Sequence, residues 1–488
     1  MERKKKTAYA ALDVGTSQVK LGVYCPWRSD EIIPLGNLSN EVQYGPAGEV
    51  RAEYAPVREK SFRLFGELGR FAKEHAVEAL YLGLCGHVSS LLEWNRAAGL
   101  PRENAFPIWL DTTCYPRLEE YQAVMGDGRS KEIIGTFLPA GTNWLFTKLL
   151  HRRPSGFAAD NLFLQVGDAV FYELTGTYHS HFSSQISLVD LRKRQYARPL
   201  TDHLQLPPAA LPTLAGGAFP VGEAQKKAFG FPAASYVFPA LADLYASLYG
   251  LRLADGEGFM LANTSEQAGA FYRQEPALLD NFLHISFGGG FVNYGSTNTG
   301  GNVVNWFVNS VLRKQSTPDL LRELTDRAAA IPPEETPLVL PYLQGERAPL
   351  WNSRLTASLL EVNGSHTDAH LFRALLESIA FARRHCFEEL GPDGLGVIKL
   401  GGGSSKNSLW NAIRADVLNK PVAVADEKEL ALAGVIDYGM EATRSPFAKP
   451  PIGFSVTEPS PGLVRRYDEK YRRFIHYQQL LRPSQIQP

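Results

Sequence analysis

Two stretches of the chain show the same order of residues: an apolar run, a turn with hydroxyl side chains, and a second apolar run. The first covers residues 9–24 and turns at 15–17, and the second covers residues 258–272 and turns at 263–265. Apolar runs separated by Gly, Asn, Ser and Thr predict a β-hairpin at each place. Because the hairpins open the two halves of the chain, they favour a duplicated α/β architecture, although two unrelated hairpins would show the same pattern.

Helical periodicity is clearest at residues 369–390, where apolar side chains recur every three or four positions and Gly391-Pro392 follows as a stop signal. A similar stripe predicts a helix at 61–75, and the Pro-, Gly- and Ala-rich segment 206–231 predicts a loop or connector. Strands alternate with helices, which indicates an α/β fold. The other predicted elements are helices at 244–253 and 408–418 and strands at 79–84 and 397–400.

A short polar break at residues 254–258 separates the predicted helix 244–253 from the second hairpin. We place the domain boundary there, with an N-terminal domain at residues 1–253 and a C-terminal domain at residues 254–488. The length of 488 residues suits two large domains or three smaller ones, and a chain of this length can bury a core without disulfides or metals.

Charge and composition narrow the class of protein. With 50 basic and 51 acidic residues the net charge is −1. The chain therefore lacks the basic excess that is typical of proteins that bind nucleic acids or membrane surfaces. No apolar run is long enough to span a membrane, and the apolar stretch after the basic residues 2–6 is too short for a signal peptide. Cys25, Cys85, Cys114 and Cys386 form no C-x-x-C pair, so neither a disulfide framework nor a thiolate zinc site is indicated. We expect a cytoplasmic protein with a solvated basic tail.

The most informative stretch is Asp13-Val-Gly-Thr-Ser-Gln-Val-Lys20. Glycine lets the backbone turn tightly, and the turn amides with the Thr16 and Ser17 hydroxyls can hold phosphate oxygens. Asp13 ends an apolar strand, where one carboxylate can help to bind hydrated Mg²⁺ beside phosphates, and Lys20 adds a positive charge. The structural alternative is a hairpin in which Asp13 caps the turn. The stretch is not a Walker A loop, which needs a different spacing of Gly and Lys.

A glycine run, Gly401-Gly-Gly-Ser-Ser405, lies between a predicted strand and a predicted helix. Without side chains its backbone can lie against a base or a sugar, and the N-terminus of the following helix favours an anion. The run therefore indicates a nucleotide site, although a flexible loop would explain an isolated glycine run equally well.

Taken in chain order, the motifs resemble the FGGY family of carbohydrate kinases, within the actin–hexokinase superfamily, over nearly the whole chain. Residues 13–20 and 263–265 are similar to the two phosphate loops of the family, residues 401–416 to its adenosine motif, and Asp243 to its catalytic base. Further segments that match in order are Cys85-Gly-His87, Ile108-Trp-Leu-Asp111, Lys148-Leu-Leu, Gly167-Asp168 with Leu174-Thr-Gly176, Gly345-Glu-Arg-Ala-Pro349, residues 357–377 and Ala431-Leu-Ala-Gly434.

The resemblance implies two ribonuclease-H-like domains of the actin–hexokinase type with the active site in a cleft between them. It implies transfer of the ATP γ-phosphoryl group to a sugar hydroxyl, with the sugar and the first phosphate loop in the N-terminal domain and ATP in the C-terminal domain. Asp243 would accept the hydroxyl proton, and Asp13 would help to bind Mg²⁺ and to orient the acceptor. The residues implied for ATP are Thr16, Ser17, Lys20, Thr264, Ser265, Gly402, Gly403, Ser404 and Asn411.

The sugar side departs most from the family pattern. The family's G-Q-x-H stands here as residues 86–89, with His87 and Ser89 at the polar positions, and the arginine of its W-x-D-x-R is Thr113. Glu361 and Ala242 stand where the family usually has Gly. The substrate residues implied by the resemblance are His87, Ser89, Asp111 and Asp243. Trp144 is a further candidate, because its ring could stack on a sugar face.

Several of these residues keep a structural alternative. His87 fits a packed histidine at a strand end as well as a sugar ligand, and Trp144 fits a structural residue as well as a platform for a sugar face. Trp109 is expected in the core, and Arg347 is expected to brace the region between the domains by hydrogen bonds. Asp243 differs from them, because its apolar, Tyr-rich surroundings do not suit a merely solvated carboxylate.

Within the family, residues 298–303 and the segment around Asp243 are most similar to sedoheptulokinase-type members, and the general run of motifs to xylulose or ribulose kinases. A five- or seven-carbon ketose is therefore the expected substrate class. Kinases for glycerol or gluconate are alternatives, as is a non-catalytic pseudokinase that senses a sugar or a nucleotide. The altered segments 86–89 and 111–113 favour the sensor, and the intact Asp13 and Asp243 oppose it. We expect a small sugar and ATP as partners, no nucleic acid and no membrane, and leave a homodimer open.

Overall fold

The computed structural model describes residues 5–207, 209–391, 395–427 and 429–481, which form two compact units. The first unit contains the chain up to Arg252 together with Glu429–Ile452, and the second contains the other described residues from Leu253 onward. The division after Arg252 lies next to the boundary placed at residue 254. The sequence places residues 429–452 in the C-terminal domain, whereas in the structure they belong to the first unit. Residues 2–4 of the basic tail and Pro392 lie outside the described residues.

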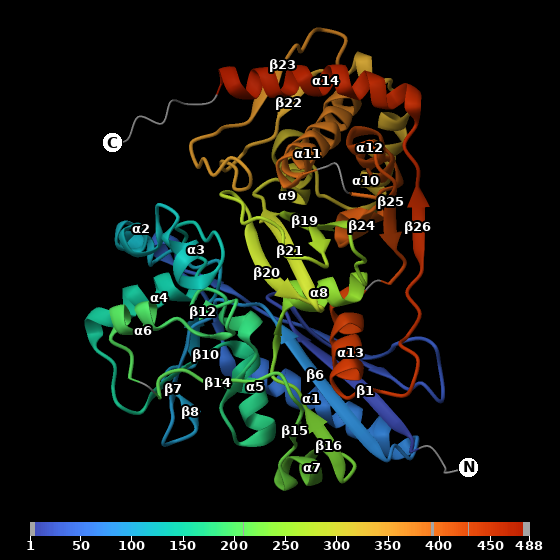
Figure 1. Cartoon of the computed structure of the whole chain (residues 1–488). Helices are drawn as coiled ribbons and strands as arrows, with labels where there is room; N and C mark the ends of the chain where they lie inside the picture. The colour runs from blue at the N-terminus through green and yellow to red at the C-terminus, as the bar shows by residue number, and fades with distance from the viewer. Residues whose placement is uncertain (1–4, 208, 392–394, 428, 482–488) are drawn as a thin grey trace. The chain divides into compact units, whose positions relative to one another are not determined.

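The first unit is built on a mixed sheet with the strand order β15-β16-β6-β1-β2-β3, in which β17 also pairs with β6 (Figure 1). β1 and β2 form the hairpin predicted at residues 9–24, which confirms that prediction, and β6 runs parallel to β1. The strands are β1 (Thr7–Val14), β2 (Gln18–Tyr24), β3 (Ile33–Ser39), β6 (Ala79–Gly86), β15 (Phe219–Pro220), β16 (Ala234–Val237) and β17 (Leu241–Ala242).

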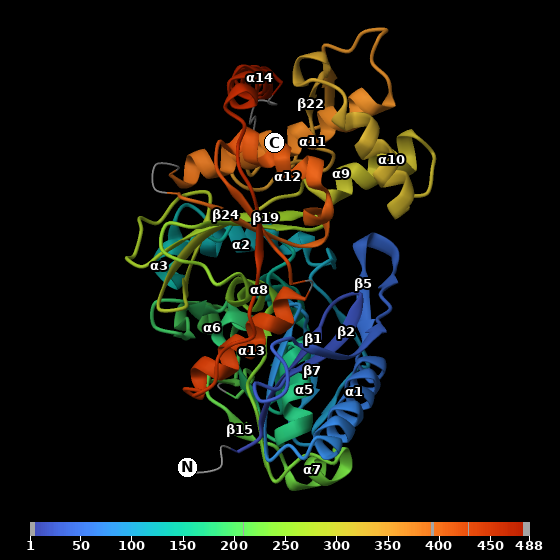
Figure 2. The same cartoon turned by 90° about the vertical axis from the view of Figure 1, so that its right-hand side faces the viewer.

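Helices cover both faces of this sheet, which is why β1 and β6 are apolar along nearly their whole length. Figure 2 shows α1 (Tyr54–Glu74) and α13 (Leu430–Ala442) on opposite sides of it. α1 begins before the helix predicted at 61–75, because its first turn also buries apolar side chains. α8 (Asp243–Leu251) packs against α13 and corresponds to the helix predicted at 244–253.

Two glycines let α8 and α13 approach closely. A Cβ at Gly434 would overlap the carbonyl oxygen of Ala246, and a Cβ at Gly250 would overlap that of Leu430. We therefore expect Gly434→Ala to lower the free energy of unfolding by about 1–3 kcal/mol, the usual range for overpacking. In contrast, Gly66→Ala, in the middle of α1 with open space around it, should raise that free energy by up to about 1 kcal/mol. Urea unfolding followed by circular dichroism measures both, and a stabilised Gly434→Ala variant would contradict the close helix contact.

The second unit has its own mixed sheet, in the order β20-β21-β19-β18-β24-β25-β26. β18 and β19 form the hairpin predicted at residues 258–272, and β24 runs parallel to β18. The strands are β18 (Gly258–Ala262), β19 (Glu266–Tyr272), β20 (Leu283–Phe287), β21 (Gly290–Ser296), β24 (Ile398–Gly401), β25 (Val422–Ala425) and β26 (Phe454–Thr457).

The helices of the second unit contribute to two apolar clusters, one with the sheet and one in which the helices pack around the short strand β22 (Leu338–Leu340). α11 (Asp368–Leu390) confirms the helix predicted at 369–390, and Gly391, with φ of 92°, ends it. α12 (Ser408–Leu418) confirms the helix predicted at 408–418. The other helices are α9 (Gly301–Trp306), which continues into the π-helical turn η5 (Phe307–Val311), α10 (Pro318–Ala329) and α14 (Pro461–Leu480).

The prediction of a loop at residues 206–231 is wrong at α7 (Glu223–Phe229). The ring of Phe229 packs edge-on against Phe62 and Phe65 of α1. This tertiary packing stabilises a helix that is too short to show clear periodicity amid Pro and Gly.

Shorter elements of the first unit lie between β3 and β16. They include β4 (Gln43–Tyr44), β5 (Val50–Glu53), β7 (Leu92–Asn95), β8 (Leu100–Pro101), β9 (Ala105–Pro107), α2 (Leu118–Met125), α3 (Arg129–Ile134), α4 (Leu145–Arg152), β10 (Asn161–Leu164), α5 (Val166–Thr175), β11 (His179–Ser180), β12 (Val189–Asp190), β13 (Gln195–Tyr196), α6 (Arg198–Leu204) and β14 (Thr213–Leu214).

No described helix is long and apolar enough to cross a membrane.

Candidate active site

Three strands of the first unit end at the same edge of the sheet. β1 ends at Val14, β6 at Gly86 and β17 at Ala242, and Gly86 is the register partner of both Val14 and Ala242. Because the three strands are parallel, the segments that follow them, including Asp243, come together at their carboxyl ends. In α/β sheets the carboxyl ends of parallel strands are where ligands bind.

Two carboxylates, Asp13 and Asp243, interact at this edge. Burial, followed by the negative charge of Asp243, raises the pKa of Asp13 to about 7, and a 3.5 Å hydrogen bond from Cys85 Sγ and the charge of Lys20 act in the opposite direction. The side chain of Asp243 is exposed to solvent, yet desolvation by the surrounding protein raises its pKa. The backbone N–H of Leu244 donates to Asp243 Oδ1 at 2.7 Å. Asp243 is thus an accessible, oriented carboxylate with a raised pKa, which suits the role of a general base.

The first unit holds three residues expected at the phosphates: Thr16 and Ser17 in the turn after β1, and Lys20 in β2. The Lys20 ammonium pairs with Glu429 (Nζ–Oε2 2.7 Å), Thr16 Oγ1 accepts a hydrogen bond from Trp109 Nε1 (3.0 Å), and Ser17 is exposed. Trp109 is 37% exposed, so the expectation that it belongs to the core is wrong. The indole N–H of Trp109 needs a polar partner, and its hydrogen bond to Thr16 Oγ1 holds the ring beside the turn. A phosphate bound at this turn would compete with Glu429 and Trp109 for the same groups.

Two residues expected on the sugar side hold loops of the first unit. Asp111 is 1% exposed, and its carboxylate accepts hydrogen bonds from the backbone N–H groups of Val50 (2.8 Å) and Thr113 (3.1 Å). The indole N–H of Trp144 donates to Pro139 O at 2.8 Å. Contact with a sugar stays a prediction for both side chains.

His87 follows β6 directly, and its backbone N–H donates to Val14 O at 3.2 Å. The residue is 7% exposed, burial lowers the pKa of its ring to about 4, and no group in the described part of the chain hydrogen-bonds its Nδ1 atom. His87 is therefore a packed, neutral histidine at a strand end that still has one unused ring nitrogen. Ser89, two residues on, is also buried and has a left-handed φ of 61°.

The raised pKa of Asp13 predicts how stability depends on pH. The folded carboxyl keeps its proton to about pH 7, whereas the unfolded carboxyl loses it near its ordinary value of 3.8. As pH rises between these values, only the unfolded state releases the proton, so stability falls and stays low above pH 7. Asp13→Asn should therefore raise the free energy of unfolding by on the order of 1–3 kcal/mol at pH 8 and change it little at pH 4. Urea unfolding at both pH values measures the difference, and an equal gain at both would contradict the raised pKa.

The second unit has a matching pair of strand ends. β18 ends at Ala262 and its parallel neighbour β24 ends at Gly401, so the turns that follow them lie side by side. Gly402 has φ of 103°, and a Cβ there would lie 2.7 Å from Ala262 O, so the two backbones are in direct contact. Ser404 Oγ donates to the same carbonyl oxygen at 3.0 Å.

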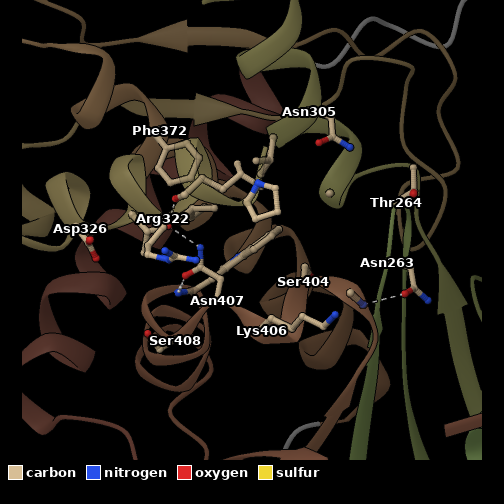
Figure 3. Close-up of a pocket in the computed structure, with 18 residues that line it drawn as sticks. Asn263, Thr264, Asn305, Arg322, Asp326, Phe372, Ser404, Lys406, Asn407 and Ser408 are labelled. Atoms are coloured by element: carbon tan, nitrogen blue, oxygen red, sulfur yellow. Dashed lines mark hydrogen bonds between the residues drawn. The ribbon is translucent and has the colours of Figure 1, made fainter. Parts of the chain in front are cut away.

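A cavity of about 710 Å³ lies beside these turns, within the second unit (Figure 3). This volume is within the usual range for ligand pockets, about 300–1,000 Å³. Apolar side chains from four helices and polar side chains near the turns line it, a combination that suits a flat base attached to charged phosphates. The lining includes Val304, Pro318, Leu321, Phe372, Leu376 and Trp410 on the apolar side and Asn263, Thr264, Asn305, Arg322, Thr325, Asp326, Gly403, Ser404, Lys406, Asn407 and Ser408 on the polar side.

Comparison with known proteins identifies the region that holds this cavity. The C-terminal domain model of the FGGY family of carbohydrate kinases matches residues 256–442. The chain carries an FGGY-family carbohydrate kinase domain. The glycerol kinase of Thermococcus onnurineus is 24% identical over 464 residues, which cover 89% of this chain and 91% of the relative. That of Myxococcus xanthus is 26% identical over 371 residues, which cover 71% and 73%.

Solved structures of a xylulose kinase and a glycerol kinase share the fold of the whole chain. A ligand-bound xylulose kinase from Lactobacillus acidophilus has a TM-score of 0.87 at 17% identity, covering 98% of this chain and 99% of that one. A Plasmodium falciparum glycerol kinase solved with ADP has a TM-score of 0.80 at 17% identity, covering 100% of both chains. The expected resemblance to FGGY carbohydrate kinases is confirmed by the domain match at residues 256–442. The expected α/β fold with two sheet-containing domains is confirmed by the solved structures. The matched FGGY carbohydrate kinase domain and the kinase relatives identify the chain as a phosphotransferase with an alcohol group as acceptor.

In the matched FGGY domain, some residues of the expected adenosine motif line the cavity, and others pack next to the turns without lining it. Asn411 is 6% exposed, donates to Ser405 O through Nδ2 (2.7 Å) and accepts from Arg414 Nη1 through Oδ1 (3.2 Å). Arg414 Nη2 also donates to Ser404 Oγ (3.0 Å) and Glu266 Oε1 (2.7 Å). Asn411 thus stabilises the glycine turn through its hydrogen bond to Ser405 O. Its contact with adenosine stays a prediction. Among the expected ATP residues of the second unit, the cavity lining includes Thr264, Gly403 and Ser404 but not Ser265, Gly402 or Asn411.

The structure accounts for one departure from the family pattern, Glu361, and for the role expected of Arg347. Glu361 has φ of 61°, a left-handed conformation that glycine adopts without strain, which explains why the family usually has Gly there. Arg347 Nη2 donates to Thr297 O at 2.6 Å, so this hydrogen bond lies within the second unit and not between domains.

Sequence patterns did not identify the apolar walls of the cavity. Phe372 and Leu376 lie on α11 and Leu321 lies on α10, and apolar residues on a helical stripe predict a core as readily as a pocket. Arg322 belongs to no motif that indicates a ligand, and Asn407 lies between the residues that match the adenosine motif. One sequence feature did point to the cavity wall: Trp410 follows the glycine run and belongs to the segment that resembles the adenosine motif.

Proposed function

We propose that the chain transfers the γ-phosphoryl group of ATP to a hydroxyl of a small sugar, with Asp243 as the general base. The observation that supports this most is the position of Asp243: an accessible carboxylate with a raised pKa, beside Asp13, at the carboxyl ends of parallel strands. A structural carboxylate in an apolar segment would instead be paired with a cation or buried in hydrogen bonds.

In the proposed reaction the acceptor oxygen forms a bond to the γ-phosphorus, the bond from that phosphorus to the bridging oxygen of ADP breaks, and the acceptor proton passes to a carboxylate oxygen of Asp243. The N–H of Leu244 already occupies Asp243 Oδ1, which leaves Oδ2 to face the acceptor. Because phosphoryl transfer needs little covalent chemistry from the protein, positioning and charge stabilisation carry most of the catalysis.

The environment of Asp13 fits the Mg²⁺ that we propose for this reaction. Its carboxylate lies beside a second one and has a raised pKa, so a cation there would relieve an unfavourable charge. No cluster of three or more acidic, His or Cys residues suited to a metal is found in the described residues. This agrees with an ion held by one or two carboxylates together with phosphates and water. Mg²⁺, when bound, neutralises charge that develops on the phosphoryl oxygens.

We assign ATP to the cavity of the second unit. Thr264 is exposed and lines the cavity, where its hydroxyl can bind phosphate oxygens, and Lys406 and Arg322 add positive charge to the lining. Phe372 and Trp410 offer apolar surface for the base. In the first unit Thr16, Ser17 and Lys20 remain proposed phosphate contacts.

The proposed acceptor is a five- or seven-carbon ketose. Glycerol is a second candidate, because the curated relatives described above are glycerol kinases. A coupled assay of ADP release with xylulose, ribulose, sedoheptulose, glycerol and gluconate tests both, and we expect the largest kcat/KM with a ketose. Binding of a sugar without ADP release from any acceptor would favour the non-catalytic sensor instead.

A further inference from the structure

Asn263 joins segments of the second unit that are separate motifs in the sequence. Its Oδ1 atom accepts a hydrogen bond from Gly403 N–H at 3.2 Å, and its carbonyl oxygen accepts one from Gly301 N–H at 3.0 Å. The residue therefore contacts the glycine turn after β24 and the first residue of α9. Figure 3 shows the side-chain bond as a dashed line at the edge of the cavity, with Thr264 beside it.

The backbones around Asn263 leave little freedom. Asn302 N–H donates to Thr264 O at 2.9 Å, and a Cβ at Gly301 would lie 3.1 Å from Asn263 O. On the other side, a Cβ at Gly402 would lie 2.7 Å from Asn263 Oδ1. The turn that carries Thr264 is thus in contact with two segments, and the Asn263 side chain ties it to the one that carries Ser404.

We propose that Asn263 is a positioning residue for the nucleotide, whose side chain fixes the glycine turn at residues 402–405 against the phosphate turn at residues 263–265 before the nucleotide binds. The proposal deepens the function proposed above and rests on ATP occupying the cavity of the second unit. A neutral amide oxygen accepts the Gly403 N–H without adding negative charge near the phosphates. Fixing both turns in advance removes part of the ordering free energy that binding would otherwise require.

The competing interpretation is that Asn263 Oδ1 occupies an N–H group that a phosphate oxygen should take. Backbone N–H groups at turns bind anions, and a charged acceptor forms the stronger hydrogen bond. The two interpretations predict opposite changes in ATP affinity when the side chain is removed, so one substitution separates them.

The test measures the dissociation constants of ATP and adenosine by isothermal titration calorimetry. Asn263→Ala is expected to raise both constants by similar factors of about 2–10, the range for one neutral hydrogen bond. Asn263→Asp keeps an acceptor for Gly403 N–H but adds a charge, so it should bind adenosine like the unmodified chain and ATP more weakly. A residue with a merely structural role would not give this separation of adenosine from ATP.

Asn363→Ala is the matched control. Asn363 lies on an exposed loop of the same unit, and its Oδ1 accepts the N–H of Ser365 at 2.9 Å, so the same kind of bond is lost away from the cavity. Both dissociation constants should stay unchanged in this variant. Unchanged or tighter ATP binding by Asn263→Ala would overturn the proposal, as would an equal loss in Asn363→Ala. Failure of the proposed function gives a different result: nucleotide binding in these titrations, but no ADP release with any acceptor.

Discussion

Asp243→Asn is expected to lower kcat by about 10²–10⁴-fold, the contribution of a general base, while the dissociation constant of ATP stays unchanged. The amide keeps the shape of the carboxylate and can still accept the N–H of Leu244, but it cannot take the acceptor proton. ATP affinity should persist because the cavity assigned to ATP lies within the second unit. In the unmodified chain kcat should fall as pH drops through the raised pKa of Asp243, because the base must be deprotonated.

Asp202→Asn provides the matched control. Asp202 is an exposed carboxylate on α6 of the same unit, away from the strand ends, and its replacement should leave kcat and the pH profile unchanged. Steady-state ADP release with the best acceptor measures all three proteins. If Asp243→Asn kept the turnover of the unmodified chain, the proton acceptor would have to be another group.

Glu266→Ala is expected to lower the free energy of unfolding of the second unit by about 3–5 kcal/mol, the usual effect of leaving a buried charge without its partner. The side chains of Glu266, Arg383 and Arg414 are all 0% exposed. Glu266 Oε1 lies 2.7 Å from Arg414 Nη2, and Oε2 lies 3.7 Å from Arg383 Nε. Removal of Glu266 would therefore leave two guanidinium groups in the interior with less compensation, one of which also holds Ser404.

The control for this prediction is Glu334→Ala. Glu334 pairs with Arg466 at 2.8 Å, but the two side chains are 53% and 54% exposed, so the loss should be about 0–1 kcal/mol. Hydrogen exchange of the α11 and α12 amides under increasing urea measures the second unit by itself, since a chain of two units need not unfold in one step. Equal effects of the two substitutions would show that the Glu266 pairs contribute no more than surface ion pairs.

Local signals made much of the fold predictable. The hairpins at residues 9–24 and 258–272 could be predicted because apolar strands and hydroxyl-bearing turns are properties of short segments. The placement of α13 could not be predicted, because its apolar sequence does not indicate which of the two sheets it covers. That choice depends on contacts such as Gly434 against Ala246, between residues far apart in the chain.

The same distinction applies to the candidate site. The resemblance to the family motifs predicts that Asp13, near the end of β1, and Asp243, after β17, serve one site, and the structure places them close enough to interact electrostatically. The exposure of Trp109 and the pairing of Lys20 with Glu429 could not be predicted, because both depend on how loops close in three dimensions. Asp111 likewise fits a substrate motif, yet its carboxylate holds Val50 and Thr113, a contact that no local pattern indicates.

The most direct test follows the phosphoryl group itself. The unmodified chain would be incubated with Mg²⁺, a ketose and ATP labelled with ¹⁸O on its γ-phosphoryl group, and the products analysed by mass spectrometry. Phosphoryl transfer predicts a labelled sugar phosphate formed in equal amount to ADP. Label found only in inorganic phosphate, or binding of ATP and sugar without any labelled sugar phosphate across the acceptor panel, would contradict the proposed kinase activity.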